Sequence, residues 1–354
     1  PSRRLFCGGS RIITPARDKR PMAFRGWDKQ QITLPNGRTV DASCPVIVSA
    51  SRATDIPAFF SQWFSNRLRE GYMRWTNPFN ANQVQYVSFK QTRVFVFWSK
   101  NPKPLIKGLA ELDRRGIHYY FQYTVNDYEE EGYEPHVPPL KVRIDTFRKL
   151  SDRIGPERVI WRMDPLLLTS RAGIPELLDK AEKIAAQLAG HTRKLVFSYA
   201  DINAYTAVQR NLNKAEADAR EFTTEEMNEI ARGIVAVAKA NGIREIATCA
   251  ELLDQQVLGV QHNRCIDDDL MIKLWPEDPA LMNFLGYEGK SLFGETDRPN
   301  LKDKGQRKEC GCIVSKDIGR YGTCPHLCVY CYANNSPAMV KRSYADHRKD
   351  GESL

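Results

Sequence analysis

Six short apolar runs, separated by helical patterns, place the strongest limit on what this chain can fold into. They are rich in β-branched and aromatic residues and apolar on both faces, and they cover residues 45–50, 93–99, 118–125, 158–165, 194–201 and 244–251. Such strands are typical of parallel sheets that are covered on both faces. Amphipathic helical patterns lie between them, at residues 58–71, 104–116, 143–155, 174–190 and 224–242, and most of these end in Gly.

Repeated strand–helix units predict an α/β fold, either a (β/α) barrel or a doubly wound sheet. Nucleotide-binding sheets carry a G-x-G-x-x-G or G-x4-G-K-[ST] fingerprint, and neither pattern follows a strand here. We therefore expect a partial (β/α) barrel. The predicted parts are a basic N-terminal arm (1–40), the barrel core (41–251), a loop-rich insert (252–311) and a cysteine region that completes the barrel (312–354).

Charge and composition suggest a kind of partner. The 354 residues are 42% hydrophobic, enough for one large domain or two ordinary ones, and no apolar run approaches the roughly 18 residues of a membrane span. The first 25 residues hold seven basic residues against Asp18 alone, so seven minus one, or six, of the nine net positive charges lie there. Such an arm is suited to neutralising phosphates of a nucleic acid; a solvated terminus is the alternative.

The cysteine content indicates a compartment. The N-terminal segment is basic but has no apolar core, so it does not resemble a signal peptide. Nine cysteines, an odd number without an export signal, indicate reduced thiols in the cytoplasm. In that compartment, clustered cysteines bind metal or perform redox chemistry more often than they form disulfides. We expect a cytoplasmic protein with no membrane partner.

Three cysteines stand close together near the C-terminus, in the stretch CPHLCVYCYA. Cys324, Cys328 and Cys331 are spaced C-x3-C-x2-C, with Tyr330 and Tyr332 on either side of the last one. A structural zinc site needs four closed ligands, and a bacterial ferredoxin run is spaced differently. Three thiolates in one tight loop can hold three irons of a 4Fe–4S cluster and leave the fourth iron open for chemistry. A zinc knuckle is the alternative.

This spacing, with an aromatic residue before the last cysteine, resembles the signature of the radical S-adenosylmethionine superfamily. CPHLCVYCYA is most similar to the spore photoproduct lyase and DNA-photolyase-like branch. The resemblance implies a 4Fe–4S cluster on Cys324, Cys328 and Cys331, with Tyr330 and Tyr332 near the adenine of S-adenosylmethionine. It implies reductive cleavage of that cofactor to a 5′-deoxyadenosyl radical, and an electron donor such as flavodoxin or ferredoxin. Since the branch acts on damaged thymine bases, it also suggests a nucleobase-containing substrate, DNA rather than RNA.

The order of segments indicates a circular permutation. In the superfamily the cysteine motif follows the first barrel strand, whereas here it comes last. The segments VIVSASRATDIP, VFVFWSKNPKPL and RIDTFRKLSDRIGPERVIWRMDPLLL resemble the branch from its second strand onward. Residues 312–315 would then close the barrel from the C-terminal side, which is feasible when chain ends lie close together. The chain also resembles a bacterial family that carries this C-terminal cysteine cluster.

Polar residues at the predicted C-terminal ends of strands are the candidates for contacting the cofactor, since these ends face the site of a barrel. They are Ser49, Ser51, Thr54, Asp55, Ser99, Lys100, Gln122, Arg162 and Asp164. Lys100 and Arg162 would pair with the cofactor carboxylate or a substrate phosphate, and carboxylates within the protein are the alternative partners. Thr54 or Asp55 has a second interpretation as the cap of the following helix. The segment SASRATD replaces the glycine-rich loop found here in many superfamily members.

Four further cysteines form a second set in the last third of the chain. They are Cys249, Cys265, Cys310 and Cys312. Together they predict a fully ligated second 4Fe–4S cluster that fastens the insert to the barrel. A structural zinc and separate buried thiols are the alternatives. Cys7 and Cys44 receive no assignment.

A rival interpretation comes from another class of protein. A nucleic-acid-binding protein without catalysis, folded by a metal at its C-terminus, would explain the basic arm. It would also explain the aromatics Trp75 and Phe79, beside Arg74, as a surface for stacking bases. An open ligand position at the cysteine motif separates the two, because radical chemistry needs it and a structural site fills it.

Overall fold

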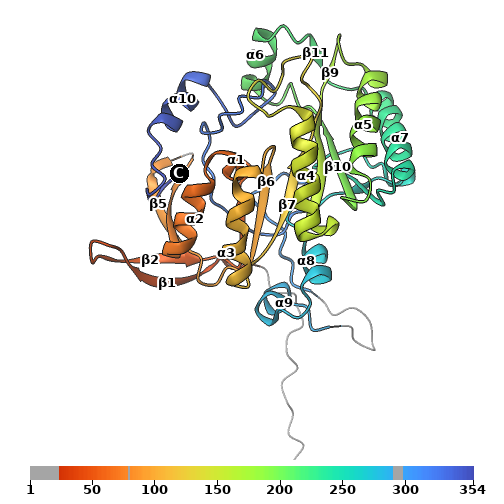
Figure 1. Cartoon of the computed structure of the whole chain (residues 1–354). Helices are drawn as coiled ribbons and strands as arrows, with labels where there is room; N and C mark the ends of the chain where they lie inside the picture. The colour runs from red at the N-terminus through yellow and green to blue at the C-terminus, as the bar shows by residue number, and fades with distance from the viewer. Residues whose placement is uncertain (1–23, 79, 290–297) are drawn as a thin grey trace, which may run out of the picture.

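Eight parallel strands form the central sheet of the protein, whose computed structural model describes residues 24–78, 80–289 and 298–354 (Figure 1). The strand order is β13-β12-β10-β8-β7-β6-β3-β14. The strands are β3 (Ile47–Ala50), β6 (Val94–Ser99), β7 (His118–Thr124), β8 (Val159–Leu166), β10 (Lys194–Tyr199), β12 (Glu245–Thr248), β13 (Gln261–His262) and β14 (Lys316–Asp317). All six apolar runs are therefore confirmed as strands of an α/β fold.

Helices connect successive strands, because parallel neighbours require a long crossover. They are α1 (Ile56–Phe59), α2 (Ser61–Glu70), the 3₁₀ helix η1 (Lys103–Gly108), α3 (Leu109–Arg114), α4 (Leu140–Ile154), α5 (Ile174–Leu188), α6 (Thr206–Lys214) and α7 (Thr224–Ala240). In Figure 1, α4, α5 and α7 follow one another along the outer side of the sheet. The five predicted helical segments are confirmed, with the first one divided at Phe60.

The two faces of the sheet are buried in two separate clusters. Phe95 and Phe97 of β6 pack in the cluster that includes the helices above. Val94 and Val96 of the same strand pack in a second cluster with residues from 265–285 and 301–314. Since side chains alternate along a strand, burial on both faces explains why β6 reads as a continuous apolar run.

On the inner face of the sheet, which packs against the second cluster, side chains become polar toward the carboxyl ends of the strands. The inward series of β7 passes from Tyr120 to Gln122, and that of β8 passes from Ile160 to Arg162 and Asp164. The apolar members of these two series, Tyr120 and Ile160, belong to the second cluster. The buried polar side chains of these two strands on this face, Gln122 and Arg162, therefore lie toward the end where the strands finish.

The predicted insert, residues 252–311, is more regular than expected. It contains the 3₁₀ helix η3 (Gln256–Leu258), β13, α8 (Asp268–Leu274) and α9 (Pro279–Leu285), while residues 290–297 lie outside the described part. Asp278 caps α9 and Gly286 ends it in a left-handed conformation. The Pro and Gly content that predicted a loop thus marks the boundaries of a short helix.

A second sheet of four strands, in the order β1-β2-β5-β4, was not predicted. Its strands are β1 (Asp28–Thr33), β2 (Thr39–Cys44), β4 (Tyr72–Asn77) and β5 (Asn80–Ser88). The basic arm therefore ends before residue 28 and not at residue 40, and residues 1–23 lie outside the described residues. The strands escaped prediction because DKQQIT and NANQVQYVS are largely polar. A short ladder joins β9 (Leu168–Thr169) to β11 (Ala219–Arg220).

The C-terminal segment returns to the edge of the central sheet. There β14 pairs in parallel with β3, with Lys316 opposite Val48 and Asp317 opposite Ser49. The strand was predicted at 312–315 and lies instead at 316–317. In the described ranges no ladder joins β14 to β13, so the strands form an open row. The chain continues through the cysteine loop to α10 (Pro337–Ala345), and no described helix is long and apolar enough to span a bilayer.

Gly319 is where the returning segment comes very close to the loop after β3. A Cβ on Gly319 would lie 1.8 Å from Ser51 Oγ, which now donates a hydrogen bond to Asp317 Oδ1 at 2.7 Å. We expect Gly319→Ala to lower the free energy of unfolding by about 2 kcal/mol, because Ser51 must move. In the control Gly108→Ala, the added Cβ would meet Ser65 Oγ at 3.1 Å, so Ser65 has to shift by only a few tenths of an ångström. Equal urea midpoints for the two variants would contradict this close approach.

Candidate cofactor and metal site

A cavity of about 470 Å³ lies at the carboxyl ends of the central strands. Ligands of open α/β sheets bind at this end, and the volume is within the range of small-molecule sites. All seven cysteines predicted as metal ligands line it: Cys249, Cys265, Cys310, Cys312, Cys324, Cys328 and Cys331. The structure therefore brings both predicted cysteine sets to one cavity, although they come from distant parts of the chain.

The C-x3-C-x2-C loop is closed by its own hydrogen bonds. Gly322 N donates to Ala333 O at 2.9 Å, and Asn334 Nδ2 donates to Cys324 O at 2.9 Å. Within the loop, Cys331 N donates to Cys328 O at 3.1 Å. These bonds fold a short segment so that its thiols face one side.

Burial makes the thiols of this loop poor acids on their own. It raises the pKa of Cys324 to about 12 and raises the pKa of Cys328 well above its usual value. Cys328 is buried, whereas Cys324 and Cys331 are partly exposed. A bound metal cation reverses this effect, because it ligates the thiolate.

His326 stands between the first two cysteines of the motif, but both of its ring nitrogens have partners. Nε2 lies 2.8 Å from Asp55 Oδ2, and Nδ1 lies 3.1 Å from the backbone oxygen of His136. The imidazole is therefore committed to holding the loop. Three thiols are the donor set that this loop presents.

Asp55 joins three segments at the mouth of the sheet. Its Oδ1 accepts hydrogen bonds from Ala58 N at 2.9 Å and Ser99 Oγ at 2.7 Å, and its Oδ2 accepts one from Lys100 N at 2.7 Å. The capping interpretation of Asp55 is confirmed, since it is the N-cap of α1. Neighbouring Thr54 also lines the cavity, and within the described chain its buried Oγ1 has no hydrogen-bond partner.

Lys100 has partners within the protein. Its Nζ donates to Glu134 Oε1 at 2.7 Å and to Tyr330 OH at 2.9 Å, and Tyr330 OH also donates to Glu134. Burial alone would raise the pKa of Glu134, but the charges of Lys100 and Arg143 outweigh it and lower the pKa to about 2. Pairing of Lys100 with a protein carboxylate, the alternative to a cofactor contact, is therefore observed. The sequence analysis missed Glu134, which follows no predicted strand end directly.

Arg162 lies deeper in the cavity wall than Lys100. It donates to the carboxylate of Asp164, to Gln122 Oε1 at 3.2 Å and to Cys265 Sγ at 3.0 Å. Gln122 is not among the cavity-lining residues, and its Nε2 donates to Cys265 O at 3.0 Å.

Ser49 is also set back from the cavity, where its Oγ lies 3.2 Å from Ser315 Oγ. Ser49 lies inside β3 and Gln122 lies inside β7, where their side chains contact Ser315 and Cys265. The other polar candidates line it: Ser51, Thr54, Asp55, Ser99, Lys100, Arg162, Asp164, Tyr330 and Tyr332.

Aromatic residues stand at the rim of the cavity. Tyr332, which is 41% exposed, stacks on Tyr205 with ring centroids 5.3 Å apart. Arg307 donates to Tyr205 OH at 2.6 Å and to Asp201 Oδ2 at 2.5 Å. Tyr332 was predicted from the sequence, whereas the other three were not, because nothing in the local pattern marks them.

The aromatic surface proposed for stacking bases is only partly described. Trp75 is half-buried, and Lys316 Nζ lies 3.4 Å from its ring centroid, so that face of the ring is closed to a base. Phe79 lies outside the described residues, as does the arm of residues 1–23.

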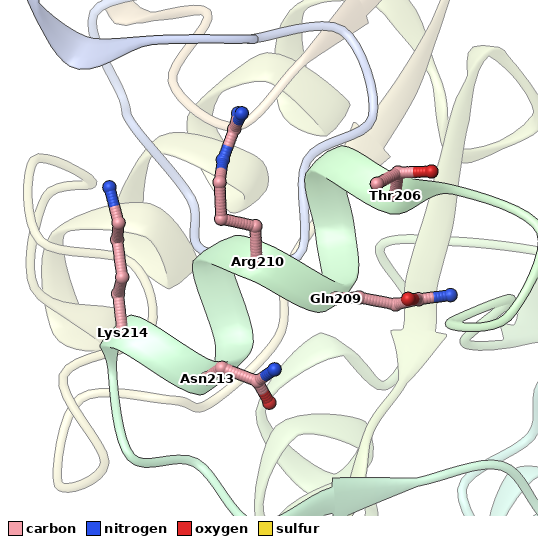
Figure 2. Close-up of a pocket in the computed structure, with 5 residues that line it drawn as sticks. All are labelled: Thr206, Gln209, Arg210, Asn213 and Lys214. Carbon is pink, nitrogen blue, oxygen red and sulfur yellow. The ribbon is translucent and has the colours of Figure 1, made fainter.

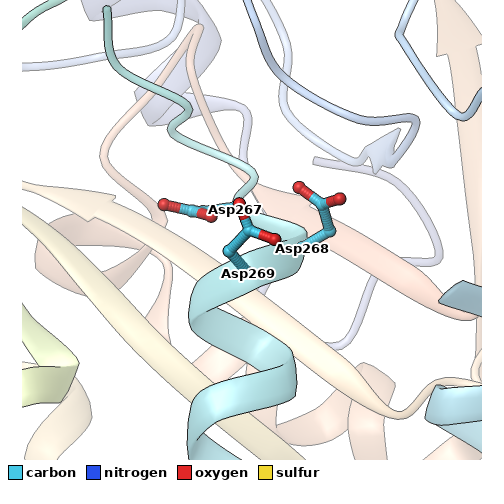
Figure 3. Close-up of side chains that lie close together, drawn as sticks. All are labelled: Asp267, Asp268 and Asp269. Atoms are coloured by element: carbon cyan, nitrogen blue, oxygen red, sulfur yellow. The ribbon is translucent and has the colours of Figure 1, made fainter. Parts of the chain in front are cut away.

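Two other features of the surface can be explained without a bound ligand. Figure 2 shows a hollow lined by Thr206, Gln209, Arg210, Asn213 and Lys214, all from the single helix α6. Figure 3 shows the acidic triplet Asp267, Asp268 and Asp269, whose carboxylates lie within 4.8 Å of one another. Asp267 caps α8, while Arg264 and Arg298 pair with the other two carboxylates.

Replacing Asp55 by Asn tests its role in holding the cysteine loop. Whichever way the amide is turned, its NH2 faces a backbone N–H, of Ala58 or of Lys100. We expect Asp55→Asn to lower the free energy of unfolding by about 3 kcal/mol, whereas the control Ser99→Ala removes one bond and costs about 1 kcal/mol. Thermal melting of the anaerobic proteins measures both. An Asp55→Asn protein as stable as Ser99→Ala would refute this role.

Comparison with known proteins places this site within a family. No curated protein and no solved structure matches the chain. One protein-family model matches residues 47–333, from the start of β3 to just beyond Cys331. The match includes both cysteine sets and the strands that end at the cavity, and it covers most of the chain. The protein therefore belongs to the family described as a domain of unknown function, DUF1848.

Proposed function

We propose that this protein is a radical S-adenosylmethionine enzyme in which Cys324, Cys328 and Cys331 ligate a 4Fe–4S cluster with one open iron. One observation carries the proposal: a loop with three thiols faces a cavity at the carboxyl ends of parallel strands. The nearest other ligand-type groups, His326 and Asp55, are engaged with each other and with neighbouring backbone and side-chain atoms. Neither His326 nor Asp55 is therefore available as a fourth protein ligand for the three thiols of this loop.

The wall of the cavity fits a polar ligand beside this loop. Thr54 Oγ1 and Arg52 Nη2 both line the cavity, and both are buried without a hydrogen-bond partner among the described residues. An unsatisfied buried polar group costs about 1–3 kcal/mol, so a ligand that bonds to these atoms gains affinity. When bound, the cluster supplies the electron that cleaves S-adenosylmethionine to methionine and a 5′-deoxyadenosyl radical.

The residues around the loop hold it in place and limit access to water. Asp55 and His326 connect the loop to the ends of β3 and β6. On the other side, Tyr330 is fastened to Lys100 and Glu134. Tyr332 and Tyr205 narrow the rim, which keeps a reactive species away from solvent.

The same proposal accounts for the order in which the barrel segments follow one another along the chain. The pairing of β14 with β3 supports a circularly permuted partial barrel, in which the cysteine loop still follows a strand at the edge next to β3. The central sheet and its crossover helices are compatible with this radical S-adenosylmethionine type of barrel.

Anaerobic reconstitution with iron and sulfide tests the proposal. We expect a brown protein that forms 5′-deoxyadenosine from S-adenosylmethionine when dithionite is added. Cys328→Ala should abolish this product, because the cluster loses a ligand. Cys44→Ala is the control, since Cys44 is a buried thiol of β2 that does not line the cavity. A colourless protein with one zinc on the three cysteines would rule out the proposal, as would undiminished product from Cys328→Ala.

We further propose a nucleobase-containing substrate, DNA rather than RNA, and an electron donor of the flavodoxin or ferredoxin type. The charge of residues 1–25 supports a polyanionic partner. For duplex DNA, the logarithm of affinity should fall by about 0.9 for each neutralised phosphate per tenfold rise in salt. Titration of labelled DNA should show this slope, and removal of residues 1–25 should reduce it. Negligible binding at low salt would leave a small molecule or peptide as the substrate.

A further inference from the structure

We propose that the second cysteine set holds an iron–sulfur cluster of its own, in the cavity that it shares with the C-x3-C-x2-C loop. The set consists of Cys249, Cys265, Cys310 and Cys312, and all four line the cavity. This inference goes beyond the proposed radical chemistry and does not depend on cleavage of S-adenosylmethionine.

The four thiols line the same cavity although they come from three segments of the chain. Cys249 follows β12, and its Sγ lies 3.5 Å from Cys265 Sγ, just after β13. The thiol of Cys312 lies next to Cys265, since it accepts a hydrogen bond from the backbone N–H of that residue, and Cys310 stands two residues before Cys312. Cys265, Cys310 and Cys312 are buried and Cys249 is partly exposed, so the set is largely removed from solvent.

Backbone and side-chain donors point at the sulfurs. Cys265 N and Ile266 N donate to Cys312 Sγ at 3.2 and 3.4 Å. Asn263 Nδ2 donates to Cys265 Sγ at 3.2 Å. Hydrogen bonds to cysteine sulfurs are one of the means by which proteins stabilise and tune iron–sulfur clusters.

Two guanidinium groups lie beside the same thiols. Arg162 Nη1 donates to Cys265 Sγ at 3.0 Å. The guanidinium of Arg52 lies within electrostatic range of Cys265, Cys310 and Cys312, and its buried Nη2 has no hydrogen-bond partner in the described ranges. Buried cations need anionic partners, and four neutral thiols are not such a partner. Arg162 also pairs with the carboxylate of Asp164, and four thiolates around a cluster would place further negative charge beside both arginines.

As a set, the four thiols are not gathered as tightly as the ligands of a single zinc ion. Sulfurs around one tetrahedral zinc lie about 3.8 Å apart, given a zinc–sulfur bond of about 2.3 Å. Within the described chain, the one group of three ligand-type side chains whose ligand atoms all lie within 4.8 Å of one another is the aspartate triplet. No three of these cysteines are that close. The Cys249–Cys265 separation of 3.5 Å also exceeds a disulfide bond.

A cluster at this position would fasten the insert to the sheet. Cys249 belongs to the end of a central strand, whereas Cys265 and Cys310 belong to the insert that covers the inner face. Ligation would thus join the segments that complete one wall of the cavity, and metal binding would add to folding stability.

The test removes the first set and counts the metal on the second. The variant Cys324→Ala/Cys328→Ala/Cys331→Ala, reconstituted anaerobically, should keep iron and acid-labile sulfide in equal amounts, about four of each for a cube. The reverse variant, Cys265→Ser/Cys312→Ser, should lose this iron and keep that of the loop. Cys44→Ala is the control and should keep both.

Zinc, a Cys249–Cys265 disulfide or no metal in the triple variant would overturn the inference. If either variant fails to fold, the intact protein decides: about eight irons with matching sulfide support two clusters, and about four contradict them. Failure of the proposed function has a different signature. Iron in the triple variant, together with no 5′-deoxyadenosine from the intact protein, would refute radical chemistry and leave the second cluster in place.

Discussion

The short ladder between β14 and β3 is the contact on which the rest of the site depends. Two residue pairs form it, and Ile318 N donates to Ser49 O at 3.0 Å just beyond it. The Asp317 carboxylate strengthens the junction by accepting hydrogen bonds from Ser51 Oγ at 2.7 Å and from Arg52 N at 3.1 Å. Because of this junction, the last segment of the chain enters the cavity from the edge of the sheet next to its first strand.

Beyond that junction, charged and polar side chains hold the cysteine loop in place. Asp55 accepts from a helix terminus, a strand end and the cysteine loop at once. In the same cavity, Arg52 and Arg162 lie against the second set of thiols. A buried cluster with negative charge needs cationic groups beside it, whereas an apolar core does not. The two cysteine sets thus share one cavity while each has its own supporting charges.

The sequence predicted the central sheet well because its strands are buried on both faces. Runs such as 93–99 have no polar alternation, and that pattern is typical of strands in a covered parallel sheet. The polar strands β1 and β5 carry no comparable signal, so the second sheet was missed. The division of the cysteines into two sets was anticipated from residue type and spacing. Their convergence on one cavity was not, and neither were the partners of individual side chains, since Glu134 reaches Lys100 only through the tertiary fold.

Anomalous diffraction at the iron absorption edge, from crystals grown anaerobically after reconstitution, tests the central claim most directly. The account predicts two separate iron peaks in one cavity. One peak should lie against Cys324, Cys328 and Cys331 with a side open to the cavity, and the other among Cys249, Cys265, Cys310 and Cys312. A zinc-edge signal at either set, or no peak at the C-x3-C-x2-C loop, would contradict it.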